Sequence, residues 1–426
     1  MTHSLRQITE SIAGFDAESL RVEIAQQAIA HCIQPITQTE RLPLKQALGR
    51  TLASDVTAPI NVPSYDNSAM DGYAFHSADL TQGTVKLKLA GKAFAGHPYH
   101  SSVKNGECVR IMTGALMPLG CDTVIPQELV TVTEDQTIRF ASERIQPMGN
   151  VRLAGEDLSV GSAVLHRGRL LTPSDLGVIA SLGIAELDVT RKLRVAFFST
   201  GDELCSIGQP LNEGCVYDSN RYTLQAMLDR AGFEAIDLGV VRDDPSALEK
   251  TLHDACRQAD AVITTGGVSA GDADHTRALM ARLGEVMFWK IAMRPGRPMA
   301  FGQLKVDGKN TVFFGLPGNP VAVMATFYFF AREALLHMQG ATPDQLPLIQ
   351  AISADLIKKR PGRTEYQRGV LTYDHQGKAH VRPTGAQGSG ILSSMSEANC
   401  MVVLAHDQAD IQAGESVTAI PFTGLI

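Results

Sequence analysis

The sequence predicts a multidomain α/β plus β protein, and three observations support that fold class. From residue 192 onward, strand and helix patterns alternate, which is typical of a doubly wound, mostly parallel sheet with helices on both faces. Between residues 55 and 148, short β-branched and apolar runs are bounded by Gly, Pro and Asn, as in a β-rich domain. A chain of 426 residues has room for roughly two to four domains of about 100–200 residues each.

Helical patterns flank the β-rich stretch on both sides. Apolar residues recur at helical spacing over 20–36 and 42–53, and Thr172 and Pro173 open a helix over 174–181. We therefore interpret the β-rich stretch as an insertion into a helical linking domain. The predicted domains are the linking domain (1–54 with 149–188), the β-rich inserted domain (55–148), the α/β domain (189–340) and a C-terminal β-barrel-like domain (346–426).

Short apolar runs mark the expected strands, and residues suited to N-caps mark the helix starts. In the inserted domain the expected strands are 84–89, 108–112, 123–126 and 137–140. In the α/β domain we expect strands over 193–199, 234–241, 261–265, 285–292 and 311–314, with helices over 219–231 and 245–259 capped by Ser219 and Asp244. In the C-terminal domain we expect strands over 369–373, 380–383, 401–405 and 416–421.

Composition and charge exclude several classes of protein. The net charge is −7, so the chain as a whole does not suit nucleic acid, and any anion site must be a local basic cluster. No apolar run approaches the roughly 20 residues that span a bilayer, and the polar N-terminus lacks the apolar core of a signal peptide. Seven cysteines form no CxxC pair, which indicates free thiols in a reducing cytosol. We expect a cytoplasmic protein that binds neither nucleic acid nor membranes.

The segment TTGGVSAGDADHTR carries the strongest chemical signal in the chain. Its small residues Gly266, Gly267, Ser269 and Gly271 lie where an expected strand turns into a helix. Backbone N–H groups can approach an anion closely there, and a helix N-terminus favours negative charge. Acids in the same loop, including Asp274, would repel a bare phosphate unless a divalent cation lies between them. The alternative is a plain glycine-rich connection.

A second turn, GLPGNP, supports the same interpretation. It follows the expected strand 311–314 and precedes a long apolar run. Asn319 suits an N-cap, and Pro320 suits the first helical position, where no N–H is needed. Alone, this pattern is an ordinary turn into a buried helix. Together with the glycine turn, it predicts a shared ligand held by Pro317, Gly318 and Asn319 at the carboxyl ends of adjacent strands.

Charged residues follow the other expected strands. Glu203 and Asp243 come after two of them, and in a doubly wound sheet such loops gather at one edge. Converging carboxylates would bind a hard cation such as Mg²⁺, whereas each acid taken alone favours a helix cap or a solvated charge. Lys290, Arg294 and Arg297 place three cations near the same edge, which suits an oxyanion or, alternatively, a solvated basic turn.

Polar residues also crowd the inserted domain. The stretch PSYDNSAMDGYAF contains Asp66, and Thr113 and Asp157 lie in two further polar turns. These stretches are either turns with side-chain-to-backbone hydrogen bonds or a surface for a polar heterocycle, and spacing does not decide between them. The chain has no P-loop signature, no dinucleotide fingerprint and no nucleophile elbow.

Taken together, these motifs resemble the molybdopterin molybdenumtransferase family of the bacterial MoeA type. The resemblance extends from about residue 20 to residue 422 and rests on many segments in the family's order. They are PSYDNSAMDGYAF, VRIMTGALMP, VRLAGEDLSVG, FFSTGDEL, YDSNRY, GVVRDDP, TTGGVSAGDAD, FWKIAMRPGRPMAFG, GLPGNPVAV, PGRTEYQRGVL and GAQGSGILSSMSEANCMVVL.

The resemblance implies a homodimer with four domains per chain and an α/β domain like that of molybdopterin adenylyltransferases. It implies insertion of molybdate into adenylyl-molybdopterin, with Mg²⁺-assisted hydrolysis of the adenylyl group to AMP. The implied partners are a molybdopterin adenylyltransferase and acceptor molybdoenzymes or their chaperones, bound transiently. Alternatives are a molybdopterin adenylyltransferase and a non-catalytic dimeric scaffold of the same fold.

The resemblance also assigns roles to residues of this chain. Glu203, Asp243 and Asp274 would form the metal and substrate site, with Asp218 nearby, and Lys290 and Arg294 would hold molybdate or the phosphates. Asp66, Thr113 and Asp157 would complete the cleft, some of them supplied by the partner subunit. One departure concerns the basic turn, where lysine is expected but Arg294 and Arg297 stand. There a planar fork replaces a point charge.

Overall fold

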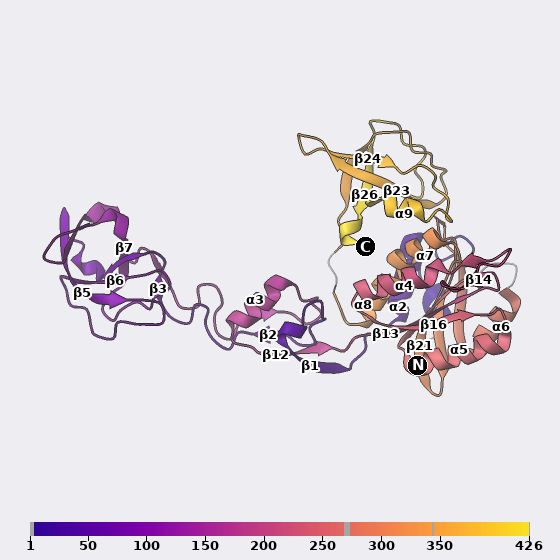
Figure 1. Ribbon diagram of the computed structural model, residues 1–426, viewed down its shortest axis with the longest axis horizontal. Coiled ribbons are helices and arrows are strands. Elements are labelled where there is room, and N and C mark those ends of the chain that lie inside the picture. Colours follow the sequence, from indigo (N-terminus) through magenta and orange to yellow (C-terminus); the bar gives the residue numbers. More distant parts are fainter. Residues whose placement is uncertain (1–3, 268–272, 343–344, 426) are drawn as a thin grey trace.

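The computed structural model describes residues 4–267, 273–342 and 345–425. Figure 1 shows an elongated molecule. The inserted domain lies at one end, the linking domain in the middle and the α/β domain at the other end, with the C-terminal domain beside the α/β domain. The inserted domain is thus separated from the α/β domain by the length of the linking domain.

The α/β domain is built on a six-stranded sheet with the strand order β16–β13–β17–β21–β20–β18. The first four strands pair in parallel, whereas β20 runs antiparallel to both β21 and β18. Two successive antiparallel pairings give β18 the direction of β21, so the carboxyl ends of five strands lie at one edge. The bounds are β13 Arg194–Thr200, β16 Glu234–Val241, β17 Ala261–Thr265, β18 Gly284–Lys290, β20 Pro298–Val306 and β21 Lys309–Leu316.

The structure confirms the five predicted strands of this sheet and adds β20, which the sequence analysis does not predict. A proline begins β20, and Gly302 lies in its middle, and both residue types are uncommon inside strands. The glycine has a structural reason. A Cβ atom at Gly302 would lie 2.2 Å from the carbonyl oxygen of Glu285 in β18. The close approach of β18 therefore requires glycine at position 302, and this glycine is also the reason why the sequence pattern did not predict a strand.

Helices cover both faces of the sheet. Successive side chains of β13 point to opposite faces, so Phe197 belongs to one hydrophobic core and Phe198 to the other. The core around Phe198 contains α5 and α6, and the core around Phe197 contains α2 (Val22–Cys32), α4, α7 and α8. The bounds are α4 Ser219–Arg230, α5 Pro245–Gln258, α6 Ala273–Leu283, α7 Pro320–Thr326 and α8 Arg332–Met338, with a π-helical turn η5 (Phe327–Ala331) between the last two.

One described helix, Pro320–Met338, is long and apolar enough to cross a membrane by length and composition. It consists of α7, η5 and α8, and 83% of its most apolar window is buried inside the molecule. A buried core helix of a globular protein passes the same test, because its apolar side chains are covered by protein. The expectation that no apolar run approaches 20 residues differs from this finding, because polar residues of α8 interrupt the run in the sequence.

The N-terminal helices pack against the α/β domain, which differs from their predicted place in the linking domain. These are α1 (Leu5–Glu10) and α2 (Val22–Cys32). The buried residues of both helices belong to the same core as β13 and α8. The backbone N–H groups of Leu5 and Arg6 also donate to the Glu285 carboxylate, at 2.9 and 2.7 Å. The apolar faces of α1 and α2 are thus buried by the α/β domain.

The predicted helix over 42–53 is wrong. This stretch contains the end of strand β1 (Thr39–Pro43) and a short 3-10 turn, Leu44–Gln46. Pro43 lacks the N–H that a helix interior needs, and Gly49 adopts φ +70, which ends any regular helix. In the linking domain β1 pairs with β12 (Glu186–Thr190), β2 (Val56–Thr57) pairs with β11 (Ala163–Leu165), and the predicted helix 174–181 is confirmed as α3 (Pro173–Ser181).

The inserted domain has a six-stranded sheet with the order β7–β4–β6–β5–β9–β8. All four predicted strands are confirmed within it, as β5, β6, β7 and β9. The shorter strands were not predicted because two to four residues give too little alternation to read. The bounds are β4 Gly72–Phe75, β5 Thr84–Ala93, β6 Glu107–Ile111, β7 Thr123–Pro126, β8 Thr131–Val132 and β9 Thr137–Ala141, with β3 (Asn67–Ser68) and β10 (Val151–Arg152) forming a separate pair.

The C-terminal domain is a closed five-stranded barrel, as predicted. Strand β23 pairs with both β24 and β25, which closes the ring β23–β24–β22–β26–β25. A sixth strand, β19 (Met293–Arg294), comes from the α/β domain and pairs in parallel with β23. The barrel is therefore fastened to the predicted basic turn. The bounds are β22 Ile349–Ser353, β23 Thr364–Tyr373, β24 Ala379–Pro383, β25 Cys400–Leu404 and β26 Ser416–Pro421.

An ion pair fixes the joint between the linking and α/β domains. Arg191, just after β12, donates two hydrogen bonds to the Asp260 carboxylate, at 2.7 and 2.8 Å. The backbone N–H of Arg194 donates to the same carboxylate at 2.9 Å. Burial alone would raise the pKa of Asp260, but these three donors lower it below the usual value of 3.8.

We expect Arg191→Met to lower the free energy of unfolding by about 3 kcal/mol at pH 7, because it leaves a carboxylate that is only 13% exposed without its cation. Since the folded pKa of Asp260 lies below 3.8, the contribution is complete above that pH and is lost as pH falls through the folded pKa. Urea unfolding followed by the fluorescence of Trp289 in β18 measures both effects.

The matched control is Arg257→Met, which removes the exposed ion pair with Asp307 at 2.9 Å. An exposed pair contributes less than about 1 kcal/mol. Equal losses in the two variants would contradict the importance of the joint.

Candidate functional site

The loops at the carboxyl edge of the α/β sheet line a cavity with a volume of about 1380 Å³. Its opposite wall comes from residues 18–19, ahead of α2, and from residues 360–363 and Ser389 of the C-terminal domain. The cavity therefore lies between three parts of the chain. The predicted site residues that line it are Glu203, Asp243, Gly266, Gly267, Lys290, Arg294, Pro317, Gly318 and Asn319.

One end of the cavity is acidic. Glu203 follows β13, and Asp243 follows β16, the parallel neighbour of β13. The Thr200 hydroxyl donates to an Asp243 carboxylate oxygen at 2.5 Å, and the Asp243 N–H donates to Asp202 at 3.3 Å. The Thr200 bond orients the Asp243 carboxylate, the Asp202 bond holds the Asp243 backbone, and no described residue donates to the second Asp243 oxygen.

Two glycine-containing turns form the floor between the ends. Gly266 has φ +86, and a Cβ atom there would lie 2.4 Å from the carbonyl oxygen of Thr200. Gly318 is close enough that its own added Cβ would lie 3.9 Å from the Gly266 Cα. The turns after β17 and β21 thus approach each other backbone to backbone. Asn319 occupies the N-cap position of α7 and Pro320 the first helical position, as predicted, although the Asn319 side chain makes no capping bond.

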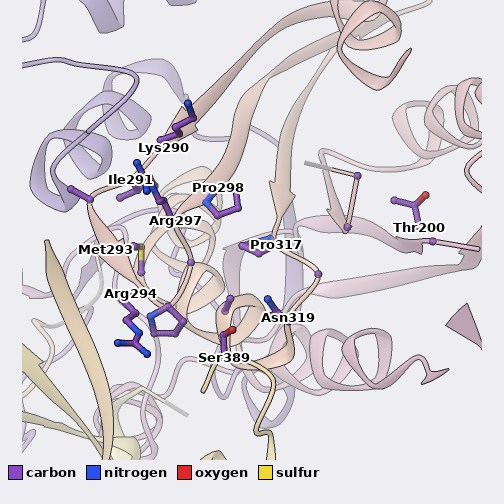
Figure 2. A pocket seen from close by; sticks show the side chains of 18 of the residues that line it. Thr200, Lys290, Ile291, Met293, Arg294, Arg297, Pro298, Pro317, Asn319 and Ser389 are labelled. Atoms are coloured by element: carbon purple, nitrogen blue, oxygen red, sulfur yellow. The ribbon is translucent and has the colours of Figure 1, made fainter. Parts of the chain in front are cut away.

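The other end of the cavity is basic. Figure 2 shows Lys290 and Arg294 on one side of the pocket and Thr200 on the other, with Asn319 between them. Lys290 forms an ion pair with Glu18. Among the described residues, the guanidinium groups of Arg294 and Arg297 have no hydrogen-bond or ion-pair partner. Two exposed cations without partners at one end of a polar cavity are suited to an anionic ligand.

The C-terminal domain completes this basic end. Arg360 and Arg363 line the cavity, and Arg363 pairs with Glu365 at 2.8 Å. The Ser389 carbonyl accepts the N–H of Val321 at 3.0 Å, so the barrel contacts the first turn of α7. Sequence reasoning missed Arg360, Arg363 and Ser389 as site residues. Their motifs, PGRTEYQRGVL and GAQGSGILSSMSEANCMVVL, were visible, but nothing local places a barrel loop at the edge of another domain's sheet.

A buried arginine shapes the barrel loop that carries Ser389. The Arg368 guanidinium donates to the Ser394 hydroxyl and to the carbonyls of residues 386–388, at 2.9 to 3.4 Å. Burial, together with the nearby charge of Arg294, lowers the pKa of Arg368 to about 10. At neutral pH the group is therefore a cation that holds the loop by charge-assisted bonds.

Three predicted site residues lie away from this cavity. Asp66 adjoins β3 in the inserted domain, where its carboxylate accepts the N–H of Ala154 at 2.7 Å. Thr113 donates through its N–H and its hydroxyl to Asp71, both at 2.8 Å, and these bonds lower the pKa of Asp71. The backbone N–H of Asp157 donates to the carbonyl of Val62 at 3.0 Å. Within one chain, the linking domain separates Asp66 and Thr113, which adjoin β3 and β6, from the cavity (Figure 1). Asp157 belongs by its position to the linking domain itself and is not among the residues that line the cavity.

Some predicted residues cannot be placed in full. Ser269 and Gly271 lie outside the described residues. Asp274 lies in the first turn of α6, but its side chain is also outside what the structure describes. Among the described residues there is no group of three His, Cys, Asp or Glu side chains that could hold a metal ion.

The predicted caps of the two helices beside the site have different outcomes. Asp244 caps α5 as predicted, with its carboxylate accepting the N–H of Ala247 at 2.8 Å. Ser219 is wrong as the cap of α4. The cap is Asp218, whose carboxylate accepts the N–H of Arg221 at 3.2 Å. Both residue types suit the position, so the sequence alone misplaced the helix start by one residue.

Comparisons with known proteins place this chain among proteins of one family. Three family models match, described as the MoeA N-terminal region (domain I and II) over residues 20–183, a probable molybdopterin binding domain over 196–337 and the MoeA C-terminal region (domain IV) over 350–422. The chain is 46% identical over 391 residues to the molybdopterin molybdenumtransferase of Haemophilus influenzae, covering 92% of this chain and 95% of that protein. It is 33% identical to the Nostoc sp. protein of the same name, covering 90% and 88%.

A solved structure also matches over nearly the full length. It is the molybdopterin biosynthesis moeA protein from Pyrococcus horikoshii, with a TM-score of 0.81 and 30% identity. The match covers 95% of this chain and 100% of that one. The chain is therefore similar to these proteins both in sequence and in its multidomain fold.

We expect Gly266→Ala to destabilise the protein more than a glycine substitution with the same backbone angle elsewhere. The control is Gly308→Ala, where φ is +81 and an added Cβ meets nothing within 4 Å. The control should cost about 1 kcal/mol for the left-handed backbone. Gly266→Ala should cost roughly 2 kcal/mol more, because the clash with the Thr200 carbonyl pushes the turn after β17 away from the end of β13. Urea unfolding followed by Trp289 fluorescence tests this, and equal costs would refute the close approach of Gly266 to Thr200.

Proposed function

The chain belongs to the molybdopterin molybdenumtransferase family of MoeA type, a family of transferases in molybdenum cofactor biosynthesis, and from that premise we propose its reaction. The substrates are molybdate and adenylyl-molybdopterin, and the products are molybdenum cofactor and AMP. The observation that supports the proposal is the separation of opposite charges along the cavity. Acids after β13 and β16 lie at one end, and cations after β18 lie at the other, with two glycine-containing turns between them.

The turns are suited to the phosphates of the substrate. Gly266 and Gly267 have positive φ values and leave the backbone uncovered. Gly318 and Asn319 lead into the N-terminus of α7. Backbone N–H groups at a helix start attract negative charge, and glycine lets an oxyanion approach them. The two turns lie side by side, so they can hold one extended anhydride between the acidic and basic ends.

Oxygen donors at the acidic end suit Mg²⁺, which takes one or two carboxylates together with substrate phosphates. Glu203 and Asp243 are the described residues that would hold it, with Asp274 as a further candidate by its place in the loop. Bound there, the ion would neutralise charge that builds on the phosphoryl oxygens during hydrolysis. Thr200 contributes by orienting the Asp243 carboxylate through its 2.5 Å hydrogen bond.

Arginines at the basic end are suited to molybdate. Arg294 and Arg297 are exposed, have no described partner and stand on a turn stiffened by Pro295 and Pro298. A guanidinium presents two parallel N–H donors, which match the edge of a tetrahedral oxyanion. Lys290 adds a point charge, although it would have to leave Glu18 to contact a ligand.

We further propose that the working unit is a cytoplasmic homodimer in which each inserted domain covers the cavity of the partner. Asp66, Thr113 and Asp157 do not line the cavity of their own chain, and the inserted domain lies at the far end of the molecule from the α/β domain (Figure 1). A two-fold axis would bring such a surface onto a second copy. A molybdopterin adenylyltransferase that supplies the substrate and molybdoenzymes or chaperones that accept the product would bind transiently.

The proposed reaction is tested by incubating the purified protein with adenylyl-molybdopterin, molybdate and Mg²⁺. We expect AMP release that depends on molybdate, stops with a chelator and activates an apo-molybdoenzyme. If molybdopterin and ATP instead give the adenylate, the protein is an adenylyltransferase. If neither reaction occurs with a folded dimer, the scaffold alternative holds.

Shared sites predict complementation between two inactive variants. Asp66→Asn and Glu203→Gln should each abolish most turnover, because each removes a carboxylate from both sites of its homodimer. After unfolding and refolding of an equal mixture, half the dimers are mixed and carry one intact site, so activity should recover to about a quarter of wild type. Refolding each variant alone is the control. Absence of recovery, with mixed dimers demonstrated by mass spectrometry, would sink the shared-site proposal.

A further inference from the structure

The burial of Asp218 exceeds what a helix cap requires. Its side chain is fully buried, although Asp244 caps the next helix in the same way from an exposed position. Taking a carboxylate out of water is costly unless it is well paired. One Asp218 oxygen has no hydrogen-bond partner, and its nearest cation, Arg221, is 3.9 Å away. Some other constraint must therefore hold this group in place.

The second Asp218 oxygen connects two strands at the edge of the sheet. It accepts the Ser199 hydroxyl at 3.0 Å, and the Ser199 oxygen in turn accepts the Thr265 hydroxyl at 3.0 Å. Ser199 and Thr265 are both buried, and each is followed directly by a residue that lines the cavity, Thr200 and Gly266. Asp218 thus adds a side-chain connection between the ends of β13 and β17, which also pair there through their backbones.

Asn220, in the same turn of α4, reaches a third element. Its amide nitrogen donates to the carbonyl of Gly318 at 2.7 Å, while its amide oxygen is buried without a partner. Gly318 belongs to the turn after β21, which also lines the cavity. The start of α4 is therefore connected to the ends of β13 and β17 and to the turn after β21, which lead to Glu203 and to the two glycine-containing turns. Neither Asp218 nor Asn220 lines the cavity itself.

We propose that Asp218 and Asn220 are positioning residues that keep the loops after β13, β17 and β21 in register. They act through Ser199, Thr265 and Gly318 and do not touch the substrate. The two unpaired buried oxygens mark a cost that the fold retains because the same residues place the cavity walls. The inference rests on the proposed function only where turnover is the readout.

The test compares Asp218→Ala with Asp218→Asn. An asparagine oxygen can still accept from Ser199 and from the Arg221 N–H, so the conservative variant keeps the geometry and loses the charge. We expect Asp218→Ala to speed amide exchange in peptides covering 261–267 and to lower turnover on the order of tenfold or more. Asp218→Asn should restore both to within a few fold of wild type. The control is Thr172→Ala, which removes the cap of α3 in the linking domain and should change neither readout.

Three results overturn the proposal. One is normal exchange and turnover in Asp218→Ala. Another is an Asp218→Asn variant as impaired in turnover as Asp218→Ala, which would mean that the charge itself acts in the reaction. If Asp218→Ala does not fold, Asn220→Ala replaces it and should speed amide exchange only over 315–320. The third overturning result is an Asn220→Ala variant in which amide exchange over 315–320 is unchanged. Wild-type protein that releases no AMP contradicts the proposed function, while the exchange data still decide this inference.

Discussion

The direction of β18 is the constraint on which the site depends. Because β20 lies antiparallel between β21 and β18, the chain leaves β18 at the same edge as it leaves the parallel strands. The basic turn after Lys290 therefore faces the acidic loops after β13 and β16 across the glycine-containing turns. With one antiparallel pairing fewer, the cations would lie at the opposite edge. The opposed charges of the cavity follow from the pairing pattern of one sheet.

The barrel is part of the same arrangement. Strand β19 belongs to the basic turn and pairs with β23 of the barrel, so the turn is held from both sides. The Ser389 carbonyl accepts a hydrogen bond from an N–H in the first turn of α7, and Arg368 holds the loop that contains Ser389. A charged loop held by backbone pairing needs little reorganisation when an anion binds, which favours tight and oriented binding. The C-terminal domain thus completes a wall of the site.

Buried polar groups gather behind the cavity. Asp218, Asn220 and Thr264 each contain a buried oxygen without a partner. Thr264 lies near the end of β17, and Asp218 and Asn220 lie at the start of α4. Folds remove such groups where they serve no purpose, because each one costs free energy. Their concentration there matches the general observation that a protein departs from local rules of stability where it places a functional site.

The sequence alone predicted the fold class, the five strands of the α/β sheet that run in one direction and most loops of the cavity. It could do so because strand alternation, helix caps and glycine turns are local patterns, and parallel strands send their loops to one edge. It did not predict β20, because Gly302 interrupts the strand pattern. It placed the start of α4 one residue too late, because Asp218 and Ser219 are both suitable caps. It predicted a helix over 42–53 that the structure does not contain, because Pro43 and Gly49 prevent one. Only the tertiary structure brought Arg360, Arg363 and Ser389 to the cavity and separated Asp66, Thr113 and Asp157 from it. Those placements depend on contacts between residues far apart in the chain, and no local pattern encodes the distance between two domains.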